Sequence, residues 1–214
     1  MENSVISVKN VTKKYKEYTV VNNVSLNVEK GDIVGLIGRN GSGKTVLMKM
    51  ICGLVASTSG EISVNEKLIG KDIDIPDNIG VIIETPGFLP NFSAFNNLMQ
   101  LAKINRKIGK NEIRNAIQKV GLTTNDKKHV GKYSLGMRQR LGLAQAIMED
   151  PDLLILDEPM NGLDKESVSE IREYLLELKK CGKTILLTSH SAEDIDVLCD
   201  MVYEMNKGSI SRVR

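Results

Sequence analysis

The sequence predicts an α/β fold with a mainly parallel core sheet, and three observations indicate it. Four short apolar runs have the length of buried strands: residues 33–37, 79–83, 153–156 and 184–188. Stretches with apolar residues at helical spacing alternate with them, at 46–54, 94–121, 134–148 and 165–180. Three of the runs end beside a carboxylate or a histidine, at the edge where open parallel sheets bind ligands.

Length and charge limit the possible classes of protein. The 214 residues suffice for one large domain or two small ones, and 41% hydrophobic residues support a packed core. The net charge of +2 gives no basic field that would indicate nucleic acid as the main partner. No apolar run approaches the roughly 18 residues of a membrane span, and residues 1–4 lack a signal-peptide pattern. We expect a cytoplasmic protein, with any membrane part supplied by another chain.

The first 30 residues are expected to be β structure, over 5–8, 18–21 and 24–28. Tyr15 lies between these runs, in a polar, lysine-rich segment. An exposed tyrosine there could stack on an adenine base, although an ordinary surface tyrosine is the commoner case.

Residues 38–45 follow the first apolar run and fit G-x-x-x-x-G-K-[ST], the loop that wraps nucleoside triphosphate phosphates. Its glycines let backbone N–H groups approach phosphate oxygens, and the helix that opens there points its positive end at the anion. Lys44 adds charge for the β- and γ-phosphates, and the Thr45 hydroxyl is placed to ligate Mg²⁺. The expected nucleotide-binding residues are Gly38, Arg39, Asn40, Gly41, Ser42, Gly43, Lys44 and Thr45.

Glu84 ends the second apolar run, which places it at the ligand edge of the sheet. The three phenylalanines Phe88, Phe92 and Phe95 follow within a few residues. They either belong to the core of the helical region over 94–121 or form an exposed surface for a partner, and the sequence leaves both open. Further along, Ser134 is a good N-cap for the helix that continues to about residue 148.

Two carboxylates follow the third apolar run, which is a costly arrangement unless they face a cation or water. Asp157 could hold Mg²⁺ through water, and Glu158 could polarise the attacking water. The alternative is a solvated pair of strand-end acids, against which the phosphate loop argues. His190 lies just past the fourth run and could contact the γ-phosphate or the attacking water, although a lone histidine is more often structural.

The order of these motifs resembles the ATP-binding cassette (ABC) ATPase family over nearly the whole chain. Tyr15 stands at the place of the adenine-stacking aromatic, and residues 38–45 at that of the phosphate loop. Residues 133–137, Tyr-Ser-Leu-Gly-Met, stand where the family has its Leu-Ser-Gly-Gly-Gln signature. Residues 153–158 resemble the Mg²⁺ and base strand, residues 162–164 the D-loop that contacts a second copy, and His190 the switch histidine.

The resemblance implies one ATPase domain over 1–214, with an antiparallel β subdomain and a helical subdomain beside the parallel core. Residues 1–86 and 150–214 would form the nucleotide-binding core with the β subdomain, and 87–149 the helical subdomain. The implied cofactors are ATP and Mg²⁺. The implied catalytic residues are Lys44, Ser134, Glu158 and His190, and the implied metal ligands are Thr45, Glu84 and Asp157.

Two partners are implied by the same resemblance. A second ATPase subunit would bind head to tail, so that Ser134 and Gly136 of one copy contact the ATP held by the other copy. An integral membrane permease would dock near Glu84 and residues 88–95 and hold the protein on the cytoplasmic face of the membrane.

Two positions depart from the family pattern. Glu84 stands where the Q-loop usually has glutamine, which adds a negative charge near the γ-phosphate. Leu135 replaces the first signature glycine, which puts a close backbone approach to phosphate in doubt. Both departures resemble the bacterial subfamily of bacitracin-resistance and lantibiotic-immunity exporters, so export of a peptide or drug-like compound is expected.

Rival functions remain at this point. The transporter could be an importer, because the cargo is not encoded in the ATPase chain. The protein could be a soluble ABC ATPase that acts on nucleic acid or ribosomes. Such proteins usually have two fused cassettes or long coiled coils, and this sequence shows neither. A small-molecule kinase would leave the Ser134 region and His190 unexplained.

Overall fold

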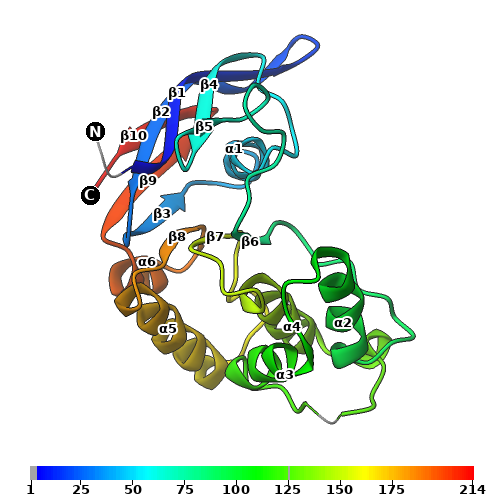
Figure 1. Ribbon diagram of the computed structural model, residues 1–214. Helices are drawn as coiled ribbons and strands as arrows, with labels where there is room; N and C mark the ends of the chain where they lie inside the picture. The colour runs from blue at the N-terminus through cyan, green and yellow to red at the C-terminus, as the bar shows by residue number, and fades with distance from the viewer. Residues whose placement is uncertain (1–3, 125) are drawn as a thin grey trace.

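The computed structural model describes residues 4–124 and 126–214. Most of the segment 1–4, which the sequence analysis considered for a signal peptide, therefore lies outside the described residues. The chain forms two sheets with helices between and beside them (Figure 1). A four-stranded antiparallel sheet has the order β2-β1-β4-β5, and a six-stranded sheet has the order β10-β9-β3-β8-β7-β6.

The six-stranded sheet is the mainly parallel sheet that the sequence predicts. Its strands are β3 (Ile33–Ile37), β6 (Ile79–Ile82), β7 (Leu153–Leu156), β8 (Thr184–Leu187), β9 (Met201–Asn206) and β10 (Ser209–Arg212). The first five run parallel, and β10 joins β9 as an antiparallel hairpin. All residues of β7 and β8 are buried, because helices or the second sheet cover both faces.

The antiparallel sheet is built from β1 (Ser4–Tyr15), β2 (Tyr18–Glu29), β4 (Ser59–Val64) and β5 (Lys67–Leu68). The sequence predicts two separate strands over 18–28, but the structure shows one long strand, β2. The reason is that the pairing of β1 with β2 shifts register in several places, so the strand continues through its irregular positions.

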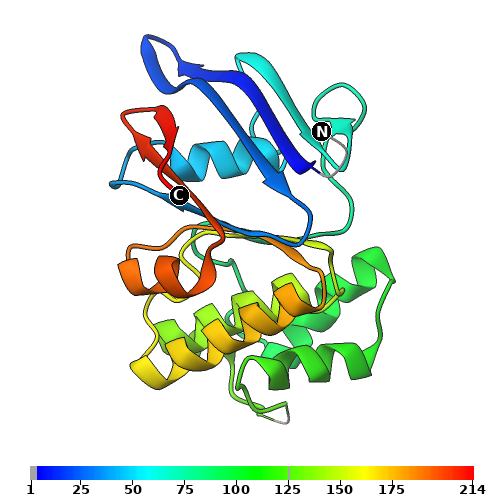
Figure 2. The same ribbon diagram turned by 90° about the vertical axis from the view of Figure 1, so that its left-hand side faces the viewer.

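Helix α1 (Lys44–Ile51) follows the phosphate loop and lies between the two sheets (Figure 2). Its residues Leu47, Met48, Met50 and Ile51 are fully buried. They share one apolar core with the antiparallel sheet and with one face of the parallel sheet. This packing fixes the start of α1, and therefore the phosphate loop, relative to both sheets.

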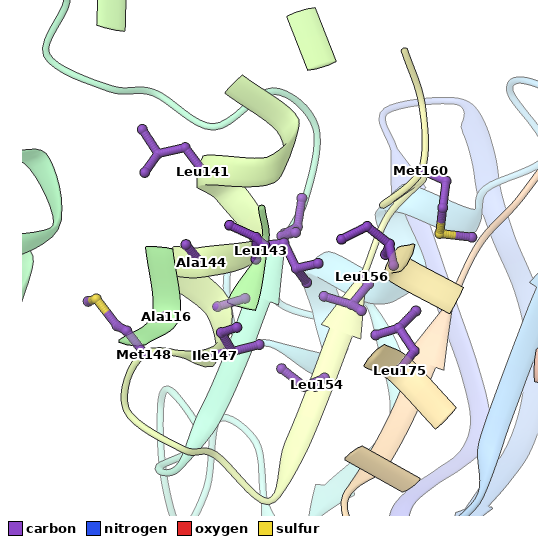
Figure 3. Close-up of a cluster of buried hydrophobic side chains, with 14 of the residues drawn as sticks. Ala116, Leu141, Leu143, Ala144, Ile147, Met148, Leu154, Leu156, Met160 and Leu175 are labelled. Atoms are coloured by element: carbon purple, nitrogen blue, oxygen red, sulfur yellow. The ribbon is translucent and has the colours of Figure 1, made fainter. Parts of the chain in front are cut away.

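The remaining helices form a second core on the other face of the parallel sheet. They are α2 (Ala94–Asn105), α3 (Lys110–Lys119), α4 (Leu135–Ile147), α5 (Lys165–Lys180) and α6 (Ala192–Leu198), with a short 3₁₀ turn at Val130–Lys132. Figure 3 shows Leu143 and Ile147 of α4 beside Leu154 and Leu156 of β7. Within the described residues, no helix is both long enough and apolar enough to cross a bilayer.

The parallel strands bring distant polar residues to one edge of the sheet. The phosphate loop follows β3, Glu84 follows β6, Asp157 follows β7 and His190 follows β8. Ile82 of β6, Leu156 of β7 and Leu187 of β8 lie in register, so the three segments end side by side. A ligand site at this edge is therefore the expected consequence of the topology.

Candidate nucleotide site

The phosphate loop turns sharply between β3 and α1. Gly38, Gly41 and Gly43 have φ of +140°, +75° and +108°, a region that favours glycine. A side chain at Gly38 would also overlap the carbonyl oxygen of Met205 in β9 and lie 2.9 Å from Ser42 Oγ. Only glycine therefore fits where the loop passes under β9.

Lys44 points back into its own loop. Its Nζ donates to the carbonyl oxygens of Gly38, at 2.6 Å, and Arg39, at 3.2 Å, and the side chain is buried. Ser42 Oγ is also buried and has no hydrogen-bond partner among the described residues. Buried donors of this kind are costly unless a ligand uses them, and phosphate oxygens are suitable acceptors.

Thr45 and Asp157 lie together beside the loop. Thr45 Oγ1 donates to Asp157 Oδ2 at 2.9 Å. The described residues contain no group of three or more His, Cys, Asp or Glu side chains that could hold a metal by themselves. A hydroxyl and one carboxylate nevertheless suit Mg²⁺, which uses one or two protein oxygens together with substrate phosphates and waters. The donor set therefore fits a metal that arrives with its nucleotide.

Glu158 follows in an unusual backbone conformation, with φ of +51°. Two side chains from other elements hold its peptide groups. Thr188 Oγ1 accepts a hydrogen bond from the Glu158 N–H at 2.9 Å, and Gln139 Nε2 of α4 donates to the Glu158 carbonyl oxygen at 2.9 Å. The turn after β7 is therefore fixed by β8 and α4.

The Glu158 carboxylate faces His190. The His190 N–H donates to Glu158 Oε2 at 3.3 Å, and His190 Nε2 lies 3.4 Å from Glu158 Oε1. Burial raises the pKa of Glu158 above its ordinary value, while His190 lowers it. A raised pKa brings a carboxylate closer to the operating pH, as a general base requires. Both residues line a pocket of about 680 Å³ together with residues 160–163.

The loop that carries His190 is anchored to the helices behind it. Ser189 Oγ donates to Asp194 Oδ2 at 2.6 Å, and both residues are buried. Arg172 of α5 forms ion pairs with Asp194 and with Glu193. This network fixes the backbone on both sides of His190 and leaves its side chain half exposed.

Glu84 lies at the end of β6 but does not contact the Thr45–Asp157 pair in this conformation. Its Oε1 is 2.7 Å from Lys49 Nζ of α1, and its side chain is 63% exposed. Tyr15, at the end of β1, is 46% exposed, and Lys13 Nζ lies 4.8 Å from its ring centroid. An adenine base would therefore use the face of the ring that Lys13 leaves open, or would displace Lys13.

Ser134 and Gly136 are placed away from the phosphate loop. Ser134 is the N-cap of α4, and its Oγ accepts a hydrogen bond from the Met137 N–H at 3.2 Å. Both residues line a pocket of about 330 Å³ with residues 162–164, and none of the phosphate-loop residues lines it. Arg140 of α4 donates to the Val120 carbonyl oxygen and forms an ion pair with Glu170.

Thr188 and Gln139 are the residues of the site that sequence reasoning missed. Thr188 ends the run 184–188, whose three middle residues are apolar, so a hydroxyl two residues before His190 was the available signal. Gln139 carries no such signal, because a glutamine on a helix is ordinarily solvated.

A phosphate loop, an Mg²⁺-type carboxylate and a buried carboxylate beside a histidine together define a nucleoside triphosphatase site. Residues 21–161 match the family model described as ABC transporter. The chain therefore belongs to the ABC transporter family, as the subunit that binds and hydrolyses ATP.

Similar proteins support this assignment. The chain is 47% identical to the uncharacterized ABC transporter ATP-binding protein YybJ of Bacillus subtilis, over 96% of this chain and 94% of YybJ. It is 44% identical to the bacitracin transport ATP-binding protein BcrA of Enterococcus faecalis, over 96% of this chain and 68% of BcrA. The predicted resemblance to the bacitracin exporters is therefore confirmed as a similarity in sequence, at 44% identity.

The fold has close counterparts among solved structures. The dimeric structure of a bacterial ABC transporter cassette superimposes with a TM-score of 0.87, covering 98% of this chain and 99% of the other, at 24% identity. The predicted fold class is confirmed. That cassette is a dimer in its own structure.

Proposed function

We propose that this chain powers the export of a peptide or drug-like compound through a separate membrane permease. The observation that supports it most directly is the similarity to BcrA, whose name assigns it to bacitracin transport. Glu84 and Leu135, the two departures from the general pattern, agree with that subfamily. Export is therefore favoured over import, and the small net charge disfavours a role on nucleic acid or ribosomes.

We further propose that two copies complete each site head to tail. Within one chain, Lys44 and Glu158 lie at the edge of the parallel sheet, whereas Ser134 and Gly136 border a different pocket. A second copy would bring the Ser134 end of α4 onto the γ-phosphate, where its N–H groups and hydroxyl suit an anion. In this arrangement, 87–149 acts as the helical subdomain, and 1–86 with 150–214 acts as the nucleotide-binding core.

The catalytic roles follow from the geometry. Lys44 turns from the loop carbonyls to the β- and γ-phosphates, and Tyr15 stacks on the base. Thr45, Asp157 and Glu84 would hold Mg²⁺, which would supply positive charge against the phosphates when bound. Glu158 takes a proton from the attacking water, and His190 beside it orients the water and the γ-phosphate. Hydrolysis then removes the γ-phosphate that joins the two copies. ATP binding therefore closes the dimer, and hydrolysis lets it open.

The permease dock lies on the segment that follows Glu84. The sequence leaves open whether the phenylalanines are core or surface, and the structure divides them. Phe88 and Phe95 pack against the helical core, whereas Phe92 is 37% exposed and its neighbour Leu89 is 51% exposed. We propose Leu89 and Phe92 as the apolar contacts for a cytoplasmic helix of the permease, which would hold the chain at the cytoplasmic face of the membrane.

The decisive experiment combines Glu158→Gln with MgATP. The variant should bind ATP, should lose hydrolysis by two orders of magnitude or more, roughly the cost of losing a general base, and should form a dimer on gel filtration. Thr184→Val serves as a control, because Thr184 lies at the other end of β8. A monomeric Glu158→Gln protein saturated with MgATP, or one that hydrolyses normally, would refute the proposal.

The partner is tested by sequencing the neighbouring reading frames and by co-expressing this chain with any hydrophobic protein that they encode. Co-purification of the two, with vanadate-sensitive hydrolysis that needs no phosphate acceptor, is the expected result. A kinase would instead require an acceptor, and a ribosome-acting ATPase would sediment with ribosomes.

A further inference from the structure

We propose that Thr188 is the positioning residue that joins the metal carboxylate Asp157 to the general base Glu158. The inference rests on the proposed role of Glu158. It assigns a function to a residue that, among the described residues, forms hydrogen bonds with Leu156, Asp157 and Glu158.

Thr188 lies directly after β8 and is completely buried. Its Oγ1 donates to Asp157 Oδ1 at 2.7 Å and accepts from the Glu158 N–H at 2.9 Å. Its own N–H donates to the Leu156 carbonyl oxygen at 3.0 Å, which fixes the backbone from which the hydroxyl projects. One hydroxyl therefore bridges the two consecutive residues that directly follow the neighbouring strand β7.

The direction of these bonds is fixed by chemistry. A threonine hydroxyl has one proton, and an ionised carboxylate can only accept. The proton therefore goes to Asp157, and a lone pair of the oxygen faces the Glu158 amide. Asp157 is left with Oδ2 for Thr45, so the two hydroxyls set the plane of the carboxylate from both sides.

The second consequence concerns the backbone of Glu158. Its φ of +51° is unfavourable for a residue with a side chain, and such conformations persist where the surroundings enforce them. Thr188 holds the N–H side of this residue, and Gln139 holds the carbonyl side. Without Thr188, the Glu158 amide loses its partner, and the peptide can relax and carry the carboxylate away from the attacking water.

Loss of the hydroxyl should therefore affect turnover more than ATP binding. Thr188→Val keeps the shape and removes the hydrogen bonds. We expect kcat to fall roughly 10–100-fold, the usual cost of removing a group that orients a catalytic ligand. KM and the affinity for a fluorescent ATP analogue should change by less than about threefold, because the contacts that bind the ground state and the transition state equally are not altered. Thr188→Ser should recover most of the lost kcat.

Thr184 provides a matched control on the same strand. It is also buried, and its Oγ1 accepts a hydrogen bond from the Gly31 N–H at 3.0 Å, at the opposite end of β8. Thr184→Val removes one hydrogen bond, whereas Thr188→Val removes two, so Thr184→Val should lower the melting temperature by a smaller amount. Its kcat should remain at the wild-type value.

The outcomes separate this inference from the proposed function. Wild-type kcat in Thr188→Val, or an equal loss of kcat in Thr184→Val, would overturn the role of Thr188 while leaving the ATPase assignment intact. Normal hydrolysis by Glu158→Gln would instead remove the proposed base. If the valine variant does not accumulate, Thr188→Ala with Thr188→Ser applies the same test. The Mg²⁺ concentration for half-maximal ATP-analogue binding, measured without turnover, should also rise in Thr188→Val and should not rise in Thr184→Val.

Discussion

Lys49 and Glu84 form an ion pair that links the phosphate-loop helix to the end of β6, with 2.7 Å between Nζ and Oε1. With the proposed nucleotide bound at the phosphate loop, the Glu84 carboxylate would add a negative charge on the same edge of the sheet. Lys49, one turn into α1, supplies a compensating positive charge. The departure at position 84 is thus balanced by a residue 35 positions earlier in the sequence.

This pair should matter for the nucleotide and little for stability. Both side chains reach solvent, so either Lys49→Gln or Glu84→Gln should change the free energy of unfolding by less than about 1 kcal/mol. Lys49→Gln leaves the Glu84 charge unbalanced, so KM for ATP should rise. Adding Glu84→Gln to it should restore KM, which a steady-state double-mutant cycle measures. Additive effects in that cycle would contradict the compensation.

Gly80→Ala should destabilise the contact between β6 and α4. A Cβ at this position would overlap the Ala146 carbonyl oxygen and approach Leu154 Cδ2 to 2.6 Å. Because a backbone atom cannot yield as a flexible side chain can, we expect a loss of about 1–3 kcal/mol or more in urea unfolding. Gly87→Ala is the matched control, since nothing lies within 4 Å of its added Cβ. Equal stability of the two variants would contradict this packing.

Glu158→Gln should show a pH-dependent gain in stability. The folded-state pKa of Glu158 is raised, chiefly by burial, so the native protein holds this proton more tightly than the unfolded chain. Stability is therefore lost as the pH rises from the ordinary glutamate pKa through the raised value. The glutamine variant avoids this loss and should melt higher at neutral pH, with the difference vanishing in acid.

Glu112→Gln gives the opposite case. Backbone N–H groups of the first turn of α3 lower the pKa of Glu112, so its contribution is present above the ordinary glutamate pKa and is lost as the pH falls through the lowered value. Its replacement should therefore lower the melting temperature at neutral pH. Thermal scans of both variants, from well below the ordinary glutamate pKa up to neutral pH, check the two signs, and a shared sign would contradict one assignment.

Gly162→Ala should be coupled to Leu135. Gly162 has φ of +77°, and an added Cβ would lie 2.6 Å from Leu135 Cδ2. Leu135→Ala removes the obstructing atoms but leaves the backbone strain, which costs about 1 kcal/mol. The double variant should thus be more stable than the sum of the single effects by about 0.5 kcal/mol or more. Strict additivity would show that the signature and D-loop segments move independently.

Leu89→Asp and Phe88→Asp should separate docking from folding. Leu89 is exposed, so its replacement should change stability by no more than about 0.5 kcal/mol and retain ATPase activity while abolishing transport. Phe88 packs against the core, so its replacement should lower the melting temperature. Unchanged transport by a fully active Leu89→Asp protein would remove this surface from the permease contact.

Local patterns allowed most of the fold to be predicted. The helix expected over 165–180 is α5 with the same bounds, and the helical region expected over 94–121 contains α2 and α3, which residues 106–109 separate. These elements follow from apolar periodicity and capping, which neighbouring residues set. The single long strand β2 could not be foreseen, because its irregular positions are sustained by pairing with β1 rather than by its own sequence.

The sequence by itself determined the phosphate loop, the strand-end residues Asp157, Glu158 and His190, and the family, because each depends on residue types at short and fixed spacing. Only the tertiary structure decided which residues from distant segments meet. It placed Lys49 against Glu84, brought Thr188 between Asp157 and Glu158, and set Ser134 apart from the phosphate loop of its own chain. Contacts across 30 residues or more arise from sheet order and helix packing, and the spacing of a motif does not contain them.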